Sequence, residues 1–490
     1  MVAEADVRSL KSCEVQNFAT KVKKELGTPV KAKFNIRVCP SVAAKLESGD
    51  EKARHHPGKI NVGYVKLPEK LTQAAAKVLE GYPEKTISTD ATKLSKYVYS
   101  RHTPLEQQEH EEKVKDIIDF VISQETLDPM TIGIDDNLKK TLLDRRENKI
   151  KTKIKQEIYN WENINYNEYM SAVYMVGRLA PDYAALMRIF KEIQKRDNKF
   201  TPQTFFDFGS GVGSGMWMIA DIRTLYLRMS CYTDCIGKSM REKLTQKGKL
   251  HILQNGPSGG NFFKQFLPSS EMLKYDIVLS SRTLFELPDM ASRLRTIDIL
   301  WRKTGGYLVL VEAGTNEGYR LLLEARDYIL EMSFRAKEHG ESHAEGYVFA
   351  PCPHDYFCPR YLDGSYTPCN FEVSYEPLKL AGRKVHPKME KFSYVVLKRG
   401  TRQDDTIESW PRVIRKPLHG KGHVICRTCT KFGQLQEFTL TKRRHGKHLY
   451  QVSKRTDWGD LLPVEVPKPE PNSTAEQQNH LDTSPLETED

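Results

Sequence analysis

The segment TFFDFGSGVGSGMWMIADI, at residues 204–222, constrains the fold of this chain more than any other part of its sequence. It reads as an apolar strand with Asp207 near its end, a turn through three glycines, and a helix. Glycines at such a turn let the backbone approach a ligand closely while the N-terminus of the helix faces it. Further strands are expected in YDIVLSSRTLFEL, GYLVLVEAG and KFSYVVLKRG, with helices between them. This alternation, from about Phe200 onward, predicts an α/β fold with a mainly parallel sheet.

The order of the acid and the glycines resembles motif I of class I S-adenosylmethionine (SAM)-dependent methyltransferases, in which the loop holds the methionine part of the cofactor. That resemblance implies a class I methyltransferase (Rossmann-like) domain with a SAM site. The second strand should end in an acid that binds the ribose hydroxyls roughly 20 residues further on, and CYTDCIGKSM offers one near that position. The predicted cofactor-binding residues are Asp207, Gly209, Gly211, Gly213 and Asp234.

No segment supplies a convincing catalytic group. Methyltransferases that act on base amino groups commonly have an N/D-P-P-Y/F loop after the fourth strand, where this chain reads SSRTLFELPD. Cytosine-C5 methyltransferases use a nucleophilic Cys. The Pro-Cys and Thr-Cys steps of this chain follow the fifth strand and are better explained as metal ligands. Glu286 could act as a base, but a Glu in a loop that enters a helix is more often structural. We therefore predict no catalytic residue.

Four cysteines in the C-terminal third form the second informative pattern. They are Cys352, Cys358 and Cys369 in APCPHDYFCPRYLDGSYTPC, and Cys429 in HVICRTCTKFG. Converging thiolates can hold zinc or an iron–sulfur cluster. Zinc ribbons usually take ligands in pairs roughly two to four residues apart, whereas five and then ten residues separate the first three cysteines here. Single ligands on proline-flanked loops favour an iron–sulfur cluster over zinc. Unligated thiols packed as small apolar side chains are the plain alternative.

The remaining cysteines agree with a reducing compartment. Five of the nine fall between residues 352 and 429, where Cys426 is the fifth, and the others are scattered. An odd number of cysteines without a secretory signal argues against a disulfide framework. No apolar run reaches the roughly 18 residues that a membrane span requires. We therefore expect a soluble chain without a membrane partner.

Positive charge is concentrated in one segment. The net charge of the chain is +11, and residues 410–455 hold twelve Lys or Arg against the single acid Glu437, which accounts for the whole excess. Aromatic and His side chains are interleaved with these cations. Clustered cations with stacking side chains are typical of proteins that bind a phosphate backbone, although a solvated face is the usual alternative. The residues predicted to bind nucleic acid are Lys442, Arg443, Arg444 and Lys447.

Composition and periodicity divide the chain into five parts. These are an irregular N-terminal region, a helical region, the α/β domain with the first three cysteines, a basic extension with the fourth, and a disordered acidic tail. Their predicted boundaries are 1–104, 105–198, 199–400, 401–465 and 466–490. Pro181 is expected to interrupt the last helix of the helical region. The N-terminus carries Glu4, Asp6 and Glu14, and a transit peptide should be poor in acids.

Several segments together resemble the Rsm-type, methyltransferase-like assembly factors of the mitochondrial small ribosomal subunit. Spanning roughly residues 165–463, they are YMVGRLAPDYAALMRIFKEI, FFDFGSGVGSG, LWRKTGGYLVLVEAGTNEGYRLLLEARD, FAPCPHDYFCP, KFSYVVLKRG, WPRV and TKRRHGKHLY…WGDLLP. The resemblance implies a class I methyltransferase fold that carries a 4Fe–4S cluster and binds small-subunit rRNA in the mitochondrial matrix. It assigns the cluster to Cys352, Cys358, Cys369 and Cys429, and so selects Cys429 over Cys426, a choice that spacing leaves open.

Three functions are compatible with these features. The first is a non-enzymatic assembly factor, monomeric away from the ribosome, that contacts rRNA and ribosomal proteins of the small subunit and uses its methyltransferase domain and cluster as a scaffold. The alternative is an active SAM-dependent rRNA methyltransferase. A zinc-dependent nucleic-acid module is the third. The missing catalytic motifs favour the first function, which would support mitochondrial translation.

Overall fold

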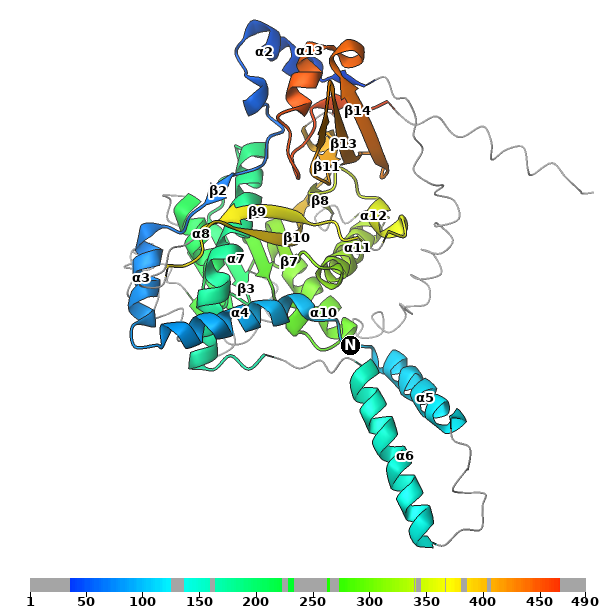
Figure 1. Cartoon of the computed structure of the whole chain (residues 1–490). Coiled ribbons are helices and arrows are strands. Elements are labelled where there is room, and N and C mark those ends of the chain that lie inside the picture. Colours follow the sequence, from blue (N-terminus) through cyan, green and yellow to red (C-terminus); the bar gives the residue numbers. More distant parts are fainter. Residues whose placement is uncertain are drawn as a thin grey trace, which may run out of the picture.

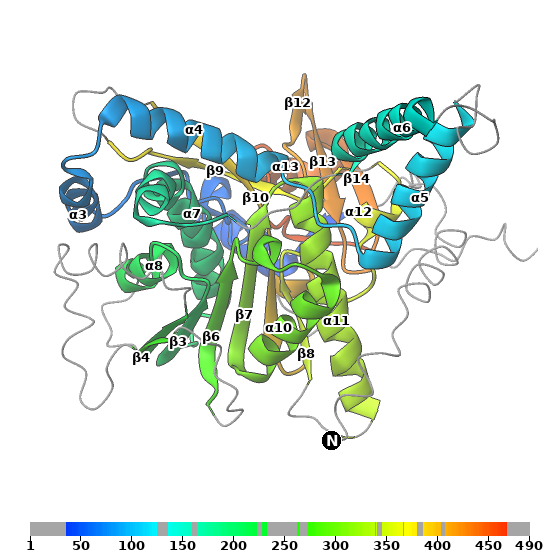
Figure 2. The same ribbon diagram turned by 90° about the horizontal axis from the view of Figure 1, so that it is seen from below.

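A computed structural model describes most of the chain. The described residues are 36–124, 136–158, 164–222, 228–232, 262–264, 273–338, 340, 345–365, 367–379, 386–402 and 407–467. At the centre of the molecule they form a mixed sheet of nine strands (Figures 1 and 2). Its main path runs through β5 (Phe262–Lys264), β4 (Arg228–Tyr232), β3 (Thr204–Phe208), β6 (Tyr275–Ser281), β7 (Thr304–Ala313), β10 (Lys388–Arg399), β9 (Phe371–Tyr375) and β2 (Tyr64–Val65).

The strand order is that of an α/β methyltransferase-like fold. Strands β5, β4, β3, β6 and β7 are parallel, and β10 then runs antiparallel to β7. The chain order along the sheet reverses at β3, and ligands of open α/β sheets bind at the carboxyl ends of strands beside such a reversal. The glycine turn follows β3 directly. The fold class predicted from strand and helix alternation is therefore confirmed.

Alternation along the strands divides the core between two helical layers. In β3, β6 and β7, Phe205, Leu279 and Val309 face a cluster built by α3 (Glu69–Leu79), α4 (Glu84–Ser100), α7 (Glu168–Arg196) and α8 (Ser214–Ile222). Their neighbours Phe206 and Val278 face the opposite layer, α10 (Met290–Arg302) and α11 (Asn316–Glu338). Successive side chains of a strand point to opposite faces, so apolar residues in sequence fill both layers. Figure 2 shows the sheet between these layers.

The last helix of the region 105–198 differs from the prediction. Helix α7 continues through Pro181 as one helix from Glu168 to Arg196. A proline ring crowds the carbonyl of the residue four positions earlier, and here that residue is Gly177. Gly177 also allows α4 to approach, because a Cβ there would lie 3.1 Å from the carbonyl oxygen of Ala91. Burial of α7 against the sheet outweighs the local cost of the proline.

One outer edge of the sheet is interrupted. Strand β8 (Gly346–Ala350) pairs with residues 396–399 of β10, and β9 pairs with residues 388–392 of the same strand. The register shifts between Val396 and Leu397. The connection between β8 and β9 leaves the sheet at this point, forms the short helix α12 (Pro359–Leu362), and contains three of the four predicted cluster cysteines.

The basic extension folds as a module with its own core. Its strands are β11 (Arg412–Val413), β12 (Leu418–Gly420), β13 (His423–Cys429) and β14 (Leu435–Thr441), followed by helix α13 (Lys442–Ser453). Strand β13 is central and pairs with the other three. Val413, Cys426, Phe438 and Leu449 pack together in its core. The module lies beside the edge of the large sheet that carries β8 and β9 (Figure 1).

The region 1–104 is predicted to be irregular, and the structure differs from residue 36 onward. It contains α2 (Pro40–Ser48), α3 and α4, whose apolar faces are buried. Its strand β1 (Arg37–Val38) pairs with β15 (Val464–Glu465) near the other end of the described chain. Helices α5 (Gln107–Ser123) and α6 (Asp136–Glu157) pack on each other and project from the body (Figure 1). None of the described helices is long and apolar enough to cross a membrane.

Candidate metal centre and cofactor loop

The structure brings the four predicted cluster cysteines to one place. Cys352 and Cys358 lie on the connection after β8, Cys369 precedes β9, and Cys429 is the last residue of β13. All four are free thiols and none is exposed. The four thiols therefore lie between the large sheet and the C-terminal module, and each of these two parts contributes at least one of them.

The pKa values of the thiols show that they interact. Burial, together with neighbouring Cys358, raises the pKa of Cys352 to about 11. Burial and then the other three cysteines raise the pKa of Cys429 well above its ordinary value. Burial and then Cys358 and Cys352 do the same for Cys369. Thiols held this way are protonated at neutral pH unless a cation compensates them, and a coordinated metal deprotonates its thiol ligands.

Strand geometry separates Cys429 from Cys426. The two residues are three positions apart on β13, and side chains at odd separations point to opposite faces of a strand. Cys426 is fully buried among Val424, Phe438 and Leu440 of the module's own core. Its pKa is raised to about 12 by burial alone. Cys426 is therefore packed in the apolar core of the module, whereas Cys429 lies with the other three cysteines.

Two polar side chains touch the sulfurs. The Tyr319 hydroxyl, on α11, lies 3.0 Å from Cys358 Sγ, and His354 Nε2 lies 3.2 Å from Cys429 Sγ. Burial and then the nearby Arg326 lower the pKa of His354 to about 3, so its ring is neutral. The sequence analysis missed both residues. The step Cys-Pro-His at residues 352–354 was the available signal for His354, whereas nothing local marks Tyr319.

Cations surround the thiols. Arg326 is buried on α11 and donates a hydrogen bond of 2.7 Å to the Tyr356 carbonyl oxygen in the cysteine connection. The Arg412 guanidinium Nε, on β11, donates a hydrogen bond of 2.9 Å to the Pro351 carbonyl oxygen. Both guanidinium groups lower the pKa of Cys352, against the larger effect of burial. The surroundings are therefore suited to a group with net negative charge.

A single bound ion does not fit this arrangement. In the part of the chain that the structure describes, no three His, Cys, Asp or Glu side chains are grouped closely enough to hold one metal ion. Four sulfurs around one zinc ion would each lie about 2.3 Å from it, and so close to one another. The thiols as they lie in this structure are therefore not arranged around one ion.

The glycine turn has the geometry that the sequence predicts. Gly209, Gly211 and Gly213 have φ angles of +70°, +49° and +84°, which other L-residues rarely adopt. A Cβ on Gly209 would lie 2.2 Å from the Thr283 hydroxyl oxygen, whereas one on Gly211 would meet open space with its nearest neighbour at 3.9 Å. Asp207 is buried below the turn. Asp234 lies outside the described residues.

Paired charges fill the region at the carboxyl ends of the central strands, next to the glycine turn. Arg282 follows β6 with φ of +61°, and lies 3.2 Å from Asp182 and 2.7 Å from Glu390. Arg178 also pairs with Glu390 at 2.7 Å, and the Tyr99 hydroxyl donates to that carboxylate at 2.5 Å. All of these groups except Tyr99 are buried. Tyr99 comes from α4, which lies across this region (Figure 2).

A second pair extends this cover. Arg101, which follows α4, is ion-paired with Glu286 and donates to the Phe285 carbonyl oxygen at 3.1 Å. Glu286 therefore has a structural partner, as is usual for an acid in such a loop. The carboxylate of Glu312, at the end of β7, accepts a hydrogen bond of 2.9 Å from the Leu284 amide. Burial raises its pKa to about 7.

Comparison with known proteins identifies the family. The family described as "Mitochondrial small ribosomal subunit Rsm22" matches residues 168–463. The human protein named "Ribosome assembly protein METTL17, mitochondrial" is 36% identical over 429 residues, covering 86% of this chain and 88% of that protein. The chain belongs to the Rsm22 family. The resemblance that the sequence segments carry is therefore confirmed.

A yeast relative shares fewer identical residues with this chain. The protein of Saccharomyces cerevisiae named "Ribosome assembly protein RSM22, mitochondrial" is 21% identical over 411 residues, covering 57% of this chain and 65% of that protein.

Among solved structures, the magnesium protoporphyrin IX methyltransferase of Synechocystis with bound SAM has a TM-score of 0.26 and 13% identity. It covers 55% of this chain and 100% of that chain.

The Rsm22-family match begins with the first residue of α7 and ends just before β15. It includes the basic cluster predicted to bind nucleic acid, at the start of α13. Lys442, Arg443, Arg444 and Lys447 are all exposed. The Thr441 hydroxyl caps this helix by accepting from the Arg444 amide. Gly446, at φ of +82°, interrupts α13 within this cluster. Four exposed cations on so short a stretch are suited to an anionic partner.

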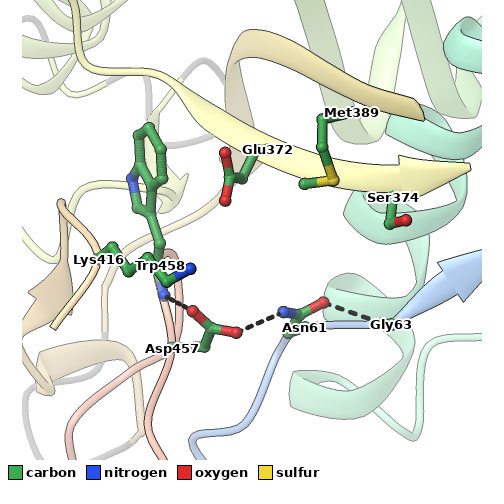
Figure 3. A pocket seen from close by; sticks show the side chains of 8 residues that line it. All are labelled: Asn61, Gly63, Glu372, Ser374, Met389, Lys416, Asp457 and Trp458. Carbon is green, nitrogen blue, oxygen red and sulfur yellow. Dashed lines mark hydrogen bonds between the residues drawn. The ribbon is translucent and has the colours of Figure 1, made fainter. Parts of the chain in front are cut away.

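The segment WGDLLP, at residues 458–463, forms the junction between the module and the rest of the chain. Asp460 is buried and accepts hydrogen bonds from the Ile60 and Asn61 amides at 2.7 and 2.9 Å. Asn61 also donates to Asp457 at 3.0 Å (Figure 3). A Cβ on Gly459 would lie 1.8 Å from a guanidinium nitrogen of Arg188. A cavity of about 220 Å³ opens here, away from the glycine turn.

Proposed function

We propose that this chain is an assembly factor of the mitochondrial small ribosomal subunit that binds small-subunit rRNA in the matrix and carries a 4Fe–4S cluster on Cys352, Cys358, Cys369 and Cys429. The relatives named above are called mitochondrial ribosome assembly proteins. The observation that carries the proposal is the position of the four thiols, which lie where the methyltransferase-like sheet meets the basic module. The cluster would thereby fix the rRNA-binding surface to the rest of the protein.

The chemistry of the site supports a cluster with this role. Thiolates are the usual ligands of 4Fe–4S clusters, and hydrogen bonds to the sulfurs are part of their environment. Tyr319 and His354 are placed to supply such hydrogen bonds, and Arg326 and Arg412 to balance negative charge. The cluster would supply a rigid crosslink between two parts of the chain that otherwise meet through side-chain contacts.

The basic cluster on α13 supplies the first test. Replacing Arg443 and Arg444 by Ala should weaken co-sedimentation with the small ribosomal subunit. Each phosphate contact contributes about 0.7 to 0.9 to the slope of log affinity against log salt, so the double variant should flatten that slope by about one to two units. SAM binding should not change, because these arginines lie in the C-terminal module, whereas the glycine turn follows β3 of the large sheet.

A matched control removes the same charge elsewhere. Arg295 and Arg302 are exposed on α10, in the helical layer of the large sheet. Their double Ala variant should sediment with the subunit as the unmodified protein does. Equal salt slopes for the α13 variant and the unmodified protein would mean that the basic residues of α13 are only a solvated surface.

We also propose that the glycine turn binds SAM through Asp207, Gly209, Gly211 and Gly213. The open space beside Gly211 favours this, so Gly211→Val should abolish binding measured by calorimetry. The positive φ strains any side chain, and the control Gly422→Val, at φ of +88° in open space, carries that strain in the distant module. Loss of binding in both variants would point to general misfolding, and unchanged binding in Gly211→Val would exclude the turn as the site.

The second candidate function is an active SAM-dependent rRNA methyltransferase. The glycine turn favours it, because the open space beside Gly211 suits a bound cofactor. The ion pairs of Arg282 and Arg101 favour the non-enzymatic function, because they occupy the edge at which a methyl acceptor would approach. Single-turnover transfer of a radiolabelled methyl group to pre-ribosomal small subunits decides between the two. Labelled rRNA would establish the enzyme.

A further inference from the structure

The hydrogen bonds to the cysteine sulfurs come from side chains that are themselves fixed. Tyr319 lies in the first turn of α11, and its hydroxyl reaches Cys358 Sγ at 3.0 Å. Both residues are buried, with exposed fractions of 7% and 6%. The Tyr319 hydroxyl thus has a defined acceptor if Cys358 is a thiolate.

The second hydrogen bond crosses between the two parts of the chain. His354 belongs to the cysteine connection of the large sheet, and its Nε2 reaches Cys429 Sγ of the module at 3.2 Å. The His354 ring also faces the Tyr356 backbone, where its Nδ1 makes no hydrogen bond of good geometry. Donation to the sulfur requires the tautomer with the proton on Nε2. Arg326 holds the backbone around His354 through the Tyr356 carbonyl oxygen.

We propose that Tyr319 and His354 are positioning residues for the cluster, and that their hydrogen bonds to Cys358 and Cys429 raise its reduction potential. This inference rests on the proposed function, since it requires the cluster. One added electron increases the negative charge on the ligand sulfurs, and a hydrogen-bond donor stabilises the more negative form more strongly. Outer-shell donors tune metal sites in this way. The cluster is therefore easier to reduce than its burial alone would make it.

The test uses Tyr319→Phe, which removes one hydroxyl and keeps the ring. Anaerobically purified protein should retain about four irons per chain, while redox titration followed by electron paramagnetic resonance should show a more negative potential. We expect the reduction equilibrium to change about tenfold, which is about 59 mV for one electron. Tyr328→Phe is the matched control, because Tyr328 lies on the same helix and packs in the core beside α10. It should leave the potential unchanged.

A pair of His354 variants provides an independent test. His354→Leu removes the donor and should lower the potential, whereas His354→Gln keeps an N–H and should restore part of the loss. If Tyr319→Phe loses its iron, this pair still decides the question. Iron-loaded variants with the potential of the unmodified protein would overturn the inference. Unmodified protein purified without iron would instead overturn the proposed cluster, so the two failures are distinguishable.

Discussion

Serine in place of any one of Cys352, Cys358, Cys369 or Cys429 should remove iron from the anaerobically purified protein and weaken its fold. A missing thiolate opens the cluster, and the free energy of metal binding is then lost from folding. The unmodified protein should be brown and hold about four irons per chain. Iron analysis, visible absorption and thermal unfolding of the four variants measure the effect. We expect all four variants to behave alike, because each ligand completes the same site.

The matched control is Cys426→Ser. Cys426 lies three residues from Cys429 on the same strand, but it faces the module's apolar core. Serine there buries a hydroxyl and costs some stability, while the iron content should remain that of the unmodified protein. Iron loss equal to that of Cys429→Ser would refute the ligand assignment. A colourless protein with stoichiometric zinc would refute the cluster itself.

Local sequence was enough to predict the elements whose chemistry is local. The glycine turn follows its strand as predicted, because φ angles of +70°, +49° and +84° require glycine at the three positions. The alternation of strands and helices predicted the sheet. The choice of Cys429 over Cys426 followed only from the family resemblance. Alternation along β13 would have separated these two residues, but the strand's boundaries and its buried face were unknown from sequence.

Features that depend on distant contacts could not be predicted. Pro181 does not end α7, because packing of that helix on the sheet outweighs a local preference. The prediction that residues 1–104 are irregular is wrong for the described part, residues 36–104. Helices α3 and α4 form there because their apolar faces pack with α7 in one core. Tyr319 lies 39 residues from Cys358 in sequence. No spacing rule connects such a pair. Asp234 lies outside the described residues and stays a prediction.

A buried ion pair lies where the module meets the sheet domain. Arg412 of β11 is paired with Glu192 of α7, and both side chains are 1% exposed. Glu192 also pairs with Arg196 at 2.8 Å. Arg412 in turn donates to the Pro351 carbonyl oxygen, next to Cys352. The pair therefore connects α7, the module and the cysteine connection at a single point.

Glu192→Gln should destabilise the protein strongly, by about 3–5 kcal/mol, because it removes the buried carboxylate that is paired with the Arg412 guanidinium. Burial alone would raise the pKa of Glu192, but Arg412 and Arg196 outweigh it and lower the pKa to about 2. The stabilisation is therefore fully present above the ordinary value of 4.5 and is lost as pH falls toward 2. Denaturant unfolding at pH 7 and pH 3 should show the difference between variant and unmodified protein narrowing in acid.

Glu437→Gln is the matched control for this substitution. Glu437 pairs with Arg427 at 2.9 Å, but both side chains are about half exposed, at 45% and 51%. Water replaces the lost partner there, and exposed pairs are worth roughly 0–1 kcal/mol. Equal effects of the two Glu→Gln changes would mean that the buried pair does not hold the module in place. A large effect of Glu192→Gln alone, with faster amide exchange in β13, would show that undocking the module exposes the strand that carries Cys429.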